Sequence, residues 1–206
     1  MQLRNLIECI IDKKSFDEIK INLDYTGKDD EINSITIGLI KINSIDCILC
    51  INNAEIMGGT LGQKEGEKIA KALEIAYKRR LPIIFILNSG GARVQEGILS
   101  LFQLSKIVSA VYKFKQKRLL LISIIFNFVY GGMSASLVGL SDIIIMEKNS
   151  RFGFAGPELI KETYNKPCED KFQSGVFVQK NGLVDIICSM EEMREILIKL
   201  LKLHGG

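Results

Sequence analysis

The sequence predicts an α/β fold, in which strands alternate with helices. The prediction rests on a unit that occurs three times: an apolar run of strand length, a glycine-containing turn, and a segment with helical spacing. The three strand-like runs lie at 81–87, 119–126 and 142–146. Because ligands of such folds bind at the carboxyl ends of the strands, we expect the glycine turns to line a ligand crevice.

The first part of the chain predicts a helix and a hairpin. Apolar residues recur at helical spacing over 2–12, and a polar connector with turn residues follows at 15–31. Two strand-like segments, 35–42 and 45–53, are separated by the turn residues Asn43 and Ser44. This spacing is typical of a β-hairpin.

Three longer helices are expected after the hairpin. The first covers 64–80, with one apolar face and a basic end that complements the helix dipole; the second runs from the turn at 88–97 to about Gln116. The third begins at a capping box formed by Ser189 and Glu192 and ends at Gly205. The residues expected to face inward are Ile69, Leu73 and Ala76 in the first helix, and Ile98, Leu101, Phe102 and Leu104 in the second.

Length and charge limit the classes of function. The 206 residues suit a single domain covering 1–206, and the net charge of +3 is spread along the chain without a basic stripe. We therefore expect no nucleic-acid partner, although a local anionic ligand fits. The five scattered cysteines favour a reducing compartment, the cytoplasm.

Two features suggest a metal or a membrane but are better explained otherwise. Cys47 and Cys50 form a C-x-x-C inside an apolar strand, where residues three apart point to opposite faces, so we expect no metal site. Residues 119–141 carry no charge and are long enough to cross a bilayer. Their β-branched first half, central glycines and small-residue second half predict a buried strand and a packed helix, not a membrane span.

The reactive side chains are few. The only histidine is His204, the third residue from the end of the sequence, so a serine or cysteine nucleophile activated by histidine is excluded. The notable feature is a Gly-Gly pair at three turns, namely Gly58-Gly59, Gly90-Gly91 and Gly131-Gly132. Turns from neighbouring strands can aim two backbone N–H groups at one oxygen, as in an oxyanion hole, but glycines also serve tight turns and close packing. The pattern alone leaves both roles open.

Several segments carry a family resemblance. "MGGTLGQKEGEK", "SGGARVQEGILSLFQLSK", "YGGMSASLVGLSDIIIMEK", "GFAGPELIKET" and "NGLVDIICSMEEMREIL" occur in the order found in carboxyltransferase β subunits of bacterial acetyl-CoA carboxylase. The opening "LIECIIDKKSFDEI" also resembles the start of acyl-CoA carboxyltransferase domains. The likeness covers nearly the whole chain and implies a crotonase/ClpP-like spiral of ββα units.

The resemblance also implies a reaction and a site. Such enzymes transfer CO₂ from carboxybiotin, held on a separate biotin carboxyl carrier protein, to an acyl thioester such as acetyl-CoA. The enolate would be held by an oxyanion hole from the turns of Gly131, Gly132, Gly90 and Gly91. Biotin would act as the base, in agreement with the lack of a suitable histidine. The resemblance places further substrate-binding positions at Gly58, Gly59, Ala92, Tyr130, Met133 and Gly156.

The sequence departs from the family in ways that affect partners and pocket. A four-cysteine zinc ribbon usually opens the β subunit and has no counterpart here, and neither an ATP-grasp module nor a biotin attachment sequence is present. Activity would therefore need other chains: a carrier protein, and either an α-type subunit or a second copy to complete the site. The stretch "FNFVY" replaces a threonine-rich run, which alters the expected pocket wall. Coenzyme A and an acyl carrier protein remain alternative handles for the acyl group.

Two charged residues near the expected site have open roles. Arg93 is predicted to pair with Glu96 or another carboxylate and hold the turn, in preference to binding phosphate. Glu158 stands where the β subunit usually has arginine, and hydratases and isomerases of the superfamily have a catalytic glutamate in a similar context. A catalytic Glu158 favours an alternative function, that of a biotin-independent malonyl-thioester decarboxylase or a crotonase-type isomerase or hydratase. The other interpretation is that Glu158 is an early-helix residue whose negative charge is favoured by the helix dipole. A non-catalytic, partner-binding subunit is a third possibility.

Overall fold

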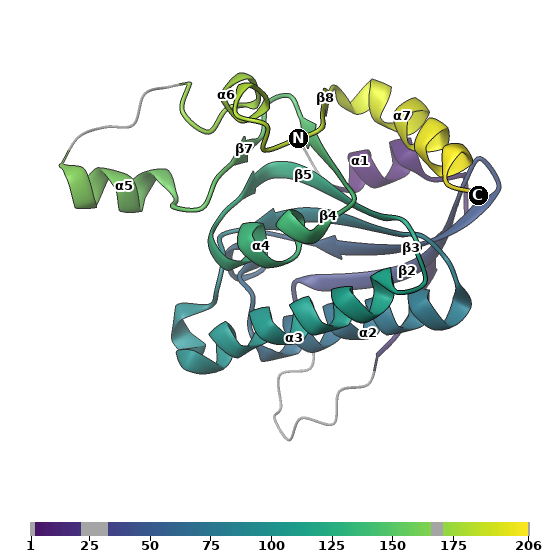
Figure 1. Cartoon of the computed structure of the whole chain (residues 1–206), viewed down its shortest axis with the longest axis horizontal. Coiled ribbons are helices and arrows are strands. Elements are labelled where there is room, and N and C mark those ends of the chain that lie inside the picture. Colours follow the sequence, from purple (N-terminus) through teal and green to yellow (C-terminus); the bar gives the residue numbers. More distant parts are fainter. Residues whose placement is uncertain (1–2, 22–32, 166–170, 206) are drawn as a thin grey trace.

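The computed structural model describes residues 3–21, 33–165 and 171–205, and in them one mixed sheet runs through the molecule (Figure 1). Its strand order is β1-β2-β3-β4-β5-β6-β8, and β7 pairs with β5 beside this path. The strands are β1 (Asp17–Glu18), β2 (Ile35–Ile42), β3 (Ile45–Asn52), β4 (Ile83–Ser89), β5 (Leu121–Val129), β6 (Ile143–Glu147), β7 (Arg151–Phe152) and β8 (Ile186–Cys188). The pairs β1–β2 and β2–β3 are antiparallel, whereas the pairs from β3 onward are parallel. The predicted α/β class is therefore confirmed.

Helices cover both faces of the sheet. The helices are α1 (Leu3–Ile10), α2 (Gln63–Arg79), α3 (Ile98–Lys115), α4 (Gly131–Ser136), α5 (Pro157–Tyr164), α6 (Gly175–Lys180) and α7 (Met190–Leu203), with short 3₁₀ turns η1 (Met57–Gly59), η2 (Val94–Glu96) and η3 (Val138–Leu140). One core cluster joins the sheet to α2, α3, α4 and α6, and a second joins the opposite face to α1 and α7. Figure 1 shows α2 and α3 side by side below the sheet and α1 and α7 above it.

The hairpin forms as the turn residues predict. Asn43 and Ser44 have φ angles of 50° and 66°, and both lie in the left-handed region that a two-residue hairpin turn requires. The carboxylate of Asp12 accepts both of their backbone N–H groups, at 2.9 and 2.8 Å. The predicted capping box of the last helix is also present, with Ser189 N–H donating to Glu192 at 2.8 Å.

Cys47 and Cys50 lie on opposite faces of β3, as strand geometry predicts. Cys50 belongs to the core cluster under α2 and α3, and Cys47 to the cluster under α1 and α7. Burial raises the pKa of Cys47 to about 12 and also raises that of Cys50. Metal binding needs thiolates on a common side, so this pair has neither the charge nor the geometry.

The uncharged stretch 119–141 folds as β5, α4 and their connections. Within the part of the chain that the structure describes, no helix is both long and apolar enough to cross a bilayer. β5 also carries an irregularity: Leu87 pairs with Ile125, but Ser89 pairs with Val129, so β5 holds two extra residues in this interval. Beyond this bulge, Phe128 and Val129 pair with β7 just before the turn at Gly131.

The predicted inward face of the second long helix is wrong for its first turns. Ile98, Leu101 and Phe102 are 64%, 53% and 60% exposed, and only Leu104 is partly buried. The buried stripe of α3 consists of Ser100, Gln103, Ile107, Val111 and Phe114. Helical spacing fits either stripe, and apolar character alone selected the outer one. In α2, by contrast, Ile69, Leu73 and Ala76 are buried as predicted.

Candidate active site

The three Gly-Gly turns follow neighbouring strands, β3, β4 and β5, and touch one another. Gly90 N–H donates to the carbonyl oxygen of Gly58 at 3.0 Å, which joins the first two turns. A Cβ atom built on Gly91 would lie 3.3 Å from the Cα atom of Gly131, so the second and third turns meet through their glycines. The sequence prediction that these turns gather at the carboxyl ends of the strands agrees with this arrangement.

Gly59 packs closely against the end of β4. It has a φ angle of 62°, and a Cβ atom there would lie 2.0 Å from the carbonyl oxygen of Asn88. Its own carbonyl oxygen accepts hydrogen bonds from Asn52 Nδ2 at 2.9 Å and Ser89 Oγ at 2.7 Å. The Gly58-Gly59 turn is therefore hydrogen-bonded to the residues that begin the Gly90-Gly91 turn, and Gly59 itself is buried.

Most of the N–H groups expected to form an oxyanion hole already have acceptors in the protein. Besides the bond from Gly90, Gly91 N–H donates to Ser89 Oγ at 3.2 Å, and Gly131 N–H donates to the carbonyl oxygen of Phe154 at 2.7 Å. Gly132 N–H, at the second position of α4, has no hydrogen-bond acceptor among the described residues. Helix N-termini commonly leave such groups for a ligand.

Ala92 offers a second unengaged N–H group. Leu61 N–H donates to the carbonyl oxygen of Gly91 at 2.7 Å, and Arg93 N–H donates to that of Leu61 at 2.9 Å. The C=O and N–H of a trans peptide point in opposite directions, so the N–H of Ala92 points away from Leu61. In the described part of the chain it has no acceptor. The sequence placed Ala92 among the substrate-binding residues, but did not identify it as a donor.

Arg93 lies beneath this turn in a buried ion-pair network. Its guanidinium group contacts Glu65 Oε1 at 2.7 Å and Glu96 Oε1 at 2.9 Å, and donates to the carbonyl oxygen of Thr60 at 2.9 Å. The side chains of Arg93 and Glu65 are only 7% and 0% exposed. Burial works against the charge, but the hydrogen bonds and charges of Glu65 and Glu96 outweigh it and raise the pKa of Arg93. The predicted pairing with Glu96 is confirmed, and Glu65 is a partner that the sequence did not indicate.

The remaining candidate residues lie around the third turn. Tyr130 precedes α4, and its ring stacks on Phe128 with centroids 5.8 Å apart and an interplanar angle of 15°. A Cβ atom on Gly156 would lie 3.9 Å from the ring of Tyr130, so the start of α5 packs against this aromatic pair. Met133 is fully buried in the core, so its side chain does not face a ligand. Glu158 is exposed in the first turn of α5.

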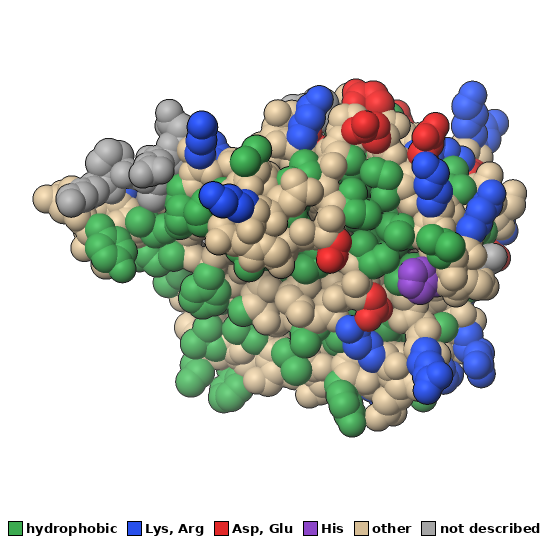
Figure 2. Space-filling model, turned by 45° about the horizontal axis from the view of Figure 1, so that its top comes forward, with side chains coloured by type: hydrophobic (Ala, Val, Ile, Leu, Met, Phe, Trp, Pro, Cys, Tyr) green, Lys and Arg blue, Asp and Glu red, His purple; other side chains and the backbone are tan. Residues whose placement is uncertain are grey.

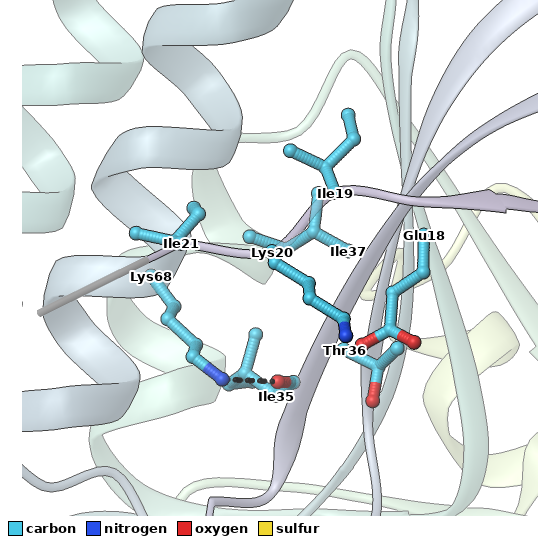
Figure 3. A pocket seen from close by; sticks show the side chains of 8 residues that line it. All are labelled: Glu18, Ile19, Lys20, Ile21, Ile35, Thr36, Ile37 and Lys68. Atoms are coloured by element: carbon cyan, nitrogen blue, oxygen red, sulfur yellow. Dashed lines mark hydrogen bonds between the residues drawn. The ribbon is translucent and has the colours of Figure 1, made fainter. Parts of the chain in front are cut away.

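The cavity shown in Figure 3 lies away from these turns. It has a volume of about 480 Å³ and is formed by residues of β1, the chain after it, β2 and α2. Lys68 reaches from α2 to the carbonyl oxygen of Ile35 at 3.2 Å, and Lys71 pairs with Glu74 at 3.0 Å. Lys68 thus contacts β2 near the edge of the sheet that is remote from Gly131, and Lys71 forms its pair within α2.

The model of the carboxyl transferase domain family matches residues 1–203. The chain belongs to this family. Among its relatives, the acetyl-coenzyme A carboxylase carboxyl transferase subunit beta of Clostridioides difficile (strain 630) is 35% identical over 220 residues, covering 99% of this chain and 78% of the relative. The subunit of the same name from Prochlorococcus marinus (strain MIT 9215) is 37% identical over 195 residues, covering 94% and 66%.

Solved structures of the carboxyl transferase family agree with the fold. The transcarboxylase 12S structure with hydrolysed methylmalonyl-coenzyme A bound is 27% identical, with a TM-score of 0.81 over 96% of this chain and 41% of that chain. The Pseudomonas malonate decarboxylase MdcD-MdcE hetero-dimer is 22% identical, with a TM-score of 0.79 over 98% of this chain and 86% of the other. These neighbours have a crotonase-like fold, which confirms the fold expected from the resemblance.

Proposed function

We propose that this chain is a single-domain β-type carboxyltransferase component that transfers CO₂ from carboxybiotin to an acyl thioester, converting acetyl-CoA to malonyl-CoA. The observation that carries the proposal is the pair of unengaged N–H groups, at Ala92 and Gly132, on turns that touch through Gly91 and Gly131. Family membership and the names of the relatives support the same reaction.

The chain contributes charge stabilisation through its backbone. When bound, carboxybiotin would supply the CO₂, and the biotin left after its release would accept the α-proton of the acyl group. The N–H groups of Ala92 and Gly132 donate to the thioester carbonyl oxygen, which gains negative charge as the enolate forms. The N-terminus of α4 adds its positive end to the same oxygen. One such donor contributes roughly 10²–10³ in rate, because it is already oriented before charge develops.

The residues around the two N–H groups fit a reaction in which biotin, and not the protein, is the base. His204 lies at the end of α7, where its Nδ1 contacts the carbonyl oxygen of Leu200 at 2.9 Å. Next to the two N–H groups lie glycines, Ala92 and the buried Arg93, none of which is a proton acceptor, and the carboxylate of Glu96 in the turn at 88–97 is paired with Arg93 at 2.9 Å. A base delivered with biotin fits a site of this composition, because the protein needs only to fix the thioester and polarise its carbonyl group.

We assign the partner surface to η2, the start of α3 and α5. Figure 2 shows apolar side chains gathered on the left side of the molecule, where α5 and the start of α3 lie in Figure 1. The exposed apolar residues on these segments and on the connection before α5 are Val94, Ile98, Leu99, Leu101, Phe102, Phe154, Leu159 and Tyr164. Exposed apolar side chains gathered in this way are typical of protein interfaces. An α-type subunit is the proposed occupant, with self-association as the alternative.

Other partners and the location follow from the reaction. The biotin would arrive on a biotin carboxyl carrier protein, and coenzyme A is the proposed handle of the acyl group. Cytoplasmic location is supported by the free thiols of Cys9, Cys47, Cys50 and Cys188 among the described residues.

Glu158 supports a second candidate, a biotin-independent decarboxylase or isomerase. It is exposed at the start of α5, and the segment before it is tied to the third turn by the bond from Gly131 N–H to Phe154. A carboxylate so close in sequence to a residue bound at the site could move protons at an enolate.

Turnover of malonyl-CoA separates the candidates. The purified chain is assayed alone and with an α-type subunit, each with and without biotin, and the thioester products are identified by mass spectrometry. Carboxyltransfer predicts acetyl-CoA only when both biotin and the subunit are present. Acetyl-CoA from the chain alone without biotin, lost in Glu158→Gln, would instead support the decarboxylase. A non-catalytic subunit predicts no turnover of malonyl-CoA under any of these conditions.

A further inference from the structure

We infer that Arg93 is a positioning residue for the reaction: it holds the peptide between Gly91 and Ala92 so that the Ala92 N–H faces the substrate. This inference rests on the proposed function, since it gives that N–H a catalytic task. Arg93 itself would not touch the substrate. Its effect would pass entirely through the backbone of the turn.

The guanidinium group is already committed to the protein. It donates through Nε to Thr60 Oγ1 at 3.2 Å, through Nη1 to Glu96 at 2.9 Å, and through Nη2 to the carbonyl oxygen of Thr60 at 2.9 Å. Nη2 also contacts Glu65 at 2.7 Å. All three nitrogens therefore have acceptors within the protein, and the side chain is only 7% exposed. A substrate carboxylate or phosphate would have to displace these bonds to reach Arg93.

The two carboxylates fix Arg93 to the start of α2. Glu65 accepts the N–H of Gly62 at 3.1 Å, and Glu96 accepts the N–H of Gln63 at 2.7 Å. Both N–H groups belong to the helix N-terminus, which favours negative charge. Arg93 thus joins two acidic groups that are themselves anchored, and the positions of all three depend on one another.

This network surrounds the backbone bridge that orients Ala92. Leu61, which makes both hydrogen bonds of the bridge, lies between Thr60 and Gly62, and both neighbours are fastened to the network. On the other side, Gly91 has a φ angle of 103° and no side chain to limit its rotation. The hydrogen bonds to Leu61, with the Arg93 network around them, therefore add a restraint on the Ala92 N–H that Gly91 itself does not supply.

The test uses Arg93→Lys in the assembled complex. Lysine keeps the charge but cannot span three separate acceptors. Arg194→Lys is the matched control, because Arg194 also joins a carboxylate and a carbonyl oxygen, those of Asp12 and Ile10, at the α1–α7 contact. We expect Arg93→Lys to lower kcat by about 10- to 100-fold with the KM for the thioester changed less than about twofold, since a misplaced oxyanion donor weakens only the transition state. The control should retain the wild-type kcat.

A second readout does not depend on turnover. Hydrogen–deuterium exchange of the purified chain should become at least about tenfold faster in peptides covering 59–63 and 88–97 of Arg93→Lys, and remain unchanged in α7. Unchanged exchange would overturn the inference, as would a raised KM with normal kcat, which indicates direct substrate binding. An inactive wild-type complex would instead overturn the proposed function, and exchange alone would then decide whether Arg93 holds the turn.

Discussion

Gly91 and Gly131 meet with no side chain between them. A Cβ atom on Gly131 would lie 3.2 Å from the Cα atom of Gly91, and one on Gly91 would lie 3.3 Å from the Cα atom of Gly131. Both residues have positive φ angles, 103° and 62°. The contact sets the separation between the two turns, and therefore between the N–H groups of Ala92 and Gly132.

Gly91→Ala should be much more harmful than Gly90→Ala. The strained φ angle and the close backbone of Gly131 should lower the free energy of unfolding by about 1–3 kcal/mol, and kcat should fall by at least about tenfold. At Gly90 the new Cβ would lie 3.5 Å from the Gly58 oxygen, an ordinary contact, so a change of under about 0.5 kcal/mol is expected. Urea unfolding and steady-state kinetics measure both effects. Equal losses of stability and of kcat in the two variants would contradict the conclusion that the Gly91–Gly131 contact sets the distance between the turns.

Gly132 should couple to Leu104. A Cβ atom on Gly132 would lie 2.7 Å from Leu104 Cδ2, so Gly132→Ala should cost about 1–3 kcal/mol by overpacking. Removal of the obstructing methyl groups in Leu104→Ala should recover part of this cost in the double variant. A double-mutant cycle of unfolding free energies measures the coupling. Strictly additive effects would show that the clash is relieved in another way.

Phe102 should be important for partner binding but not for folding. Its side chain is 60% exposed on the first half of α3, so Phe102→Ser should leave the unfolding free energy within about 0.5 kcal/mol. A buried aromatic anchor at an interface contributes about 2 kcal/mol or more, which corresponds to a loss of at least about 30-fold in affinity for the α-type subunit. Tyr112→Ser, at a position 72% exposed near the other end of α3, is the control. Titration calorimetry should show that Tyr112→Ser binds the α-type subunit as the wild type does. If Tyr112→Ser instead bound more weakly than Phe102→Ser, the interface would lie at the other end of α3.

Glu158 should be dispensable for carboxyl transfer. Glu158→Gln removes a charge from the first turn of α5 and should cost about 0.3–1 kcal/mol at most, through the helix dipole. The kcat of the biotin-dependent reaction should remain within about twofold of the wild type. Glu162→Gln changes an exposed glutamate in the same helix outside that turn and controls for surface charge. A specific loss in Glu158→Gln would give this carboxylate a catalytic role.

Asp12 should make stability depend on acid pH. Its pKa lies below the ordinary value of 3.8, chiefly because Arg194 donates a hydrogen bond to it, with further bonds from Ser44 and Asn43. A depressed pKa stabilises the fold above the unfolded-state value and loses this effect as the pH falls through the folded-state value. Asp12→Asn should therefore cost about 1–3 kcal/mol at pH 7, and the difference from wild type should shrink below about pH 4. Asp46→Asn, in a surface pair with Lys41, should change stability little at either pH.

Local sequence patterns predicted the elements that surround the site. Alternating apolar residues predicted β2 and β3, the turn residues Asn43 and Ser44 predicted the hairpin, and three Gly-Gly pairs marked the turns that meet after β3, β4 and β5. These features depend on neighbours in the chain, which is why spacing and residue type suffice. The connector predicted at 15–31 contains the short strand β1, which the sequence did not predict, and its residues 22–31 lie outside the described part of the chain.

The working parts of the site depend on contacts between distant residues. An N–H group of a turn is free or engaged depending on acceptors in other segments of the chain; for example, the carbonyl oxygen of Phe154 accepts the N–H of Gly131. No pattern within the turn itself reveals such an acceptor. Glu65 joins Arg93 from 28 positions earlier in the chain, and α3 turned an apolar stripe outward. The Ala92 N–H could have been recognised as a donor only from the hydrogen bonds that Gly91 and Arg93, on either side of it, make to Leu61. Leu61 lies about 30 residues earlier in the chain, so no local pattern reveals them.

The main-chain nature of the two donors has a practical consequence for mutagenesis. Alanine scanning removes side chains, and it would leave the N–H groups at 92 and 132 in place; position 92 is already alanine. Such a scan would report the residues that support the site and pass over the donors themselves. Exchange of the amide for an ester at position 92, by semisynthesis with a lactic acid unit, deletes the N–H while keeping the methyl group. Only chemistry of this kind addresses the donor directly.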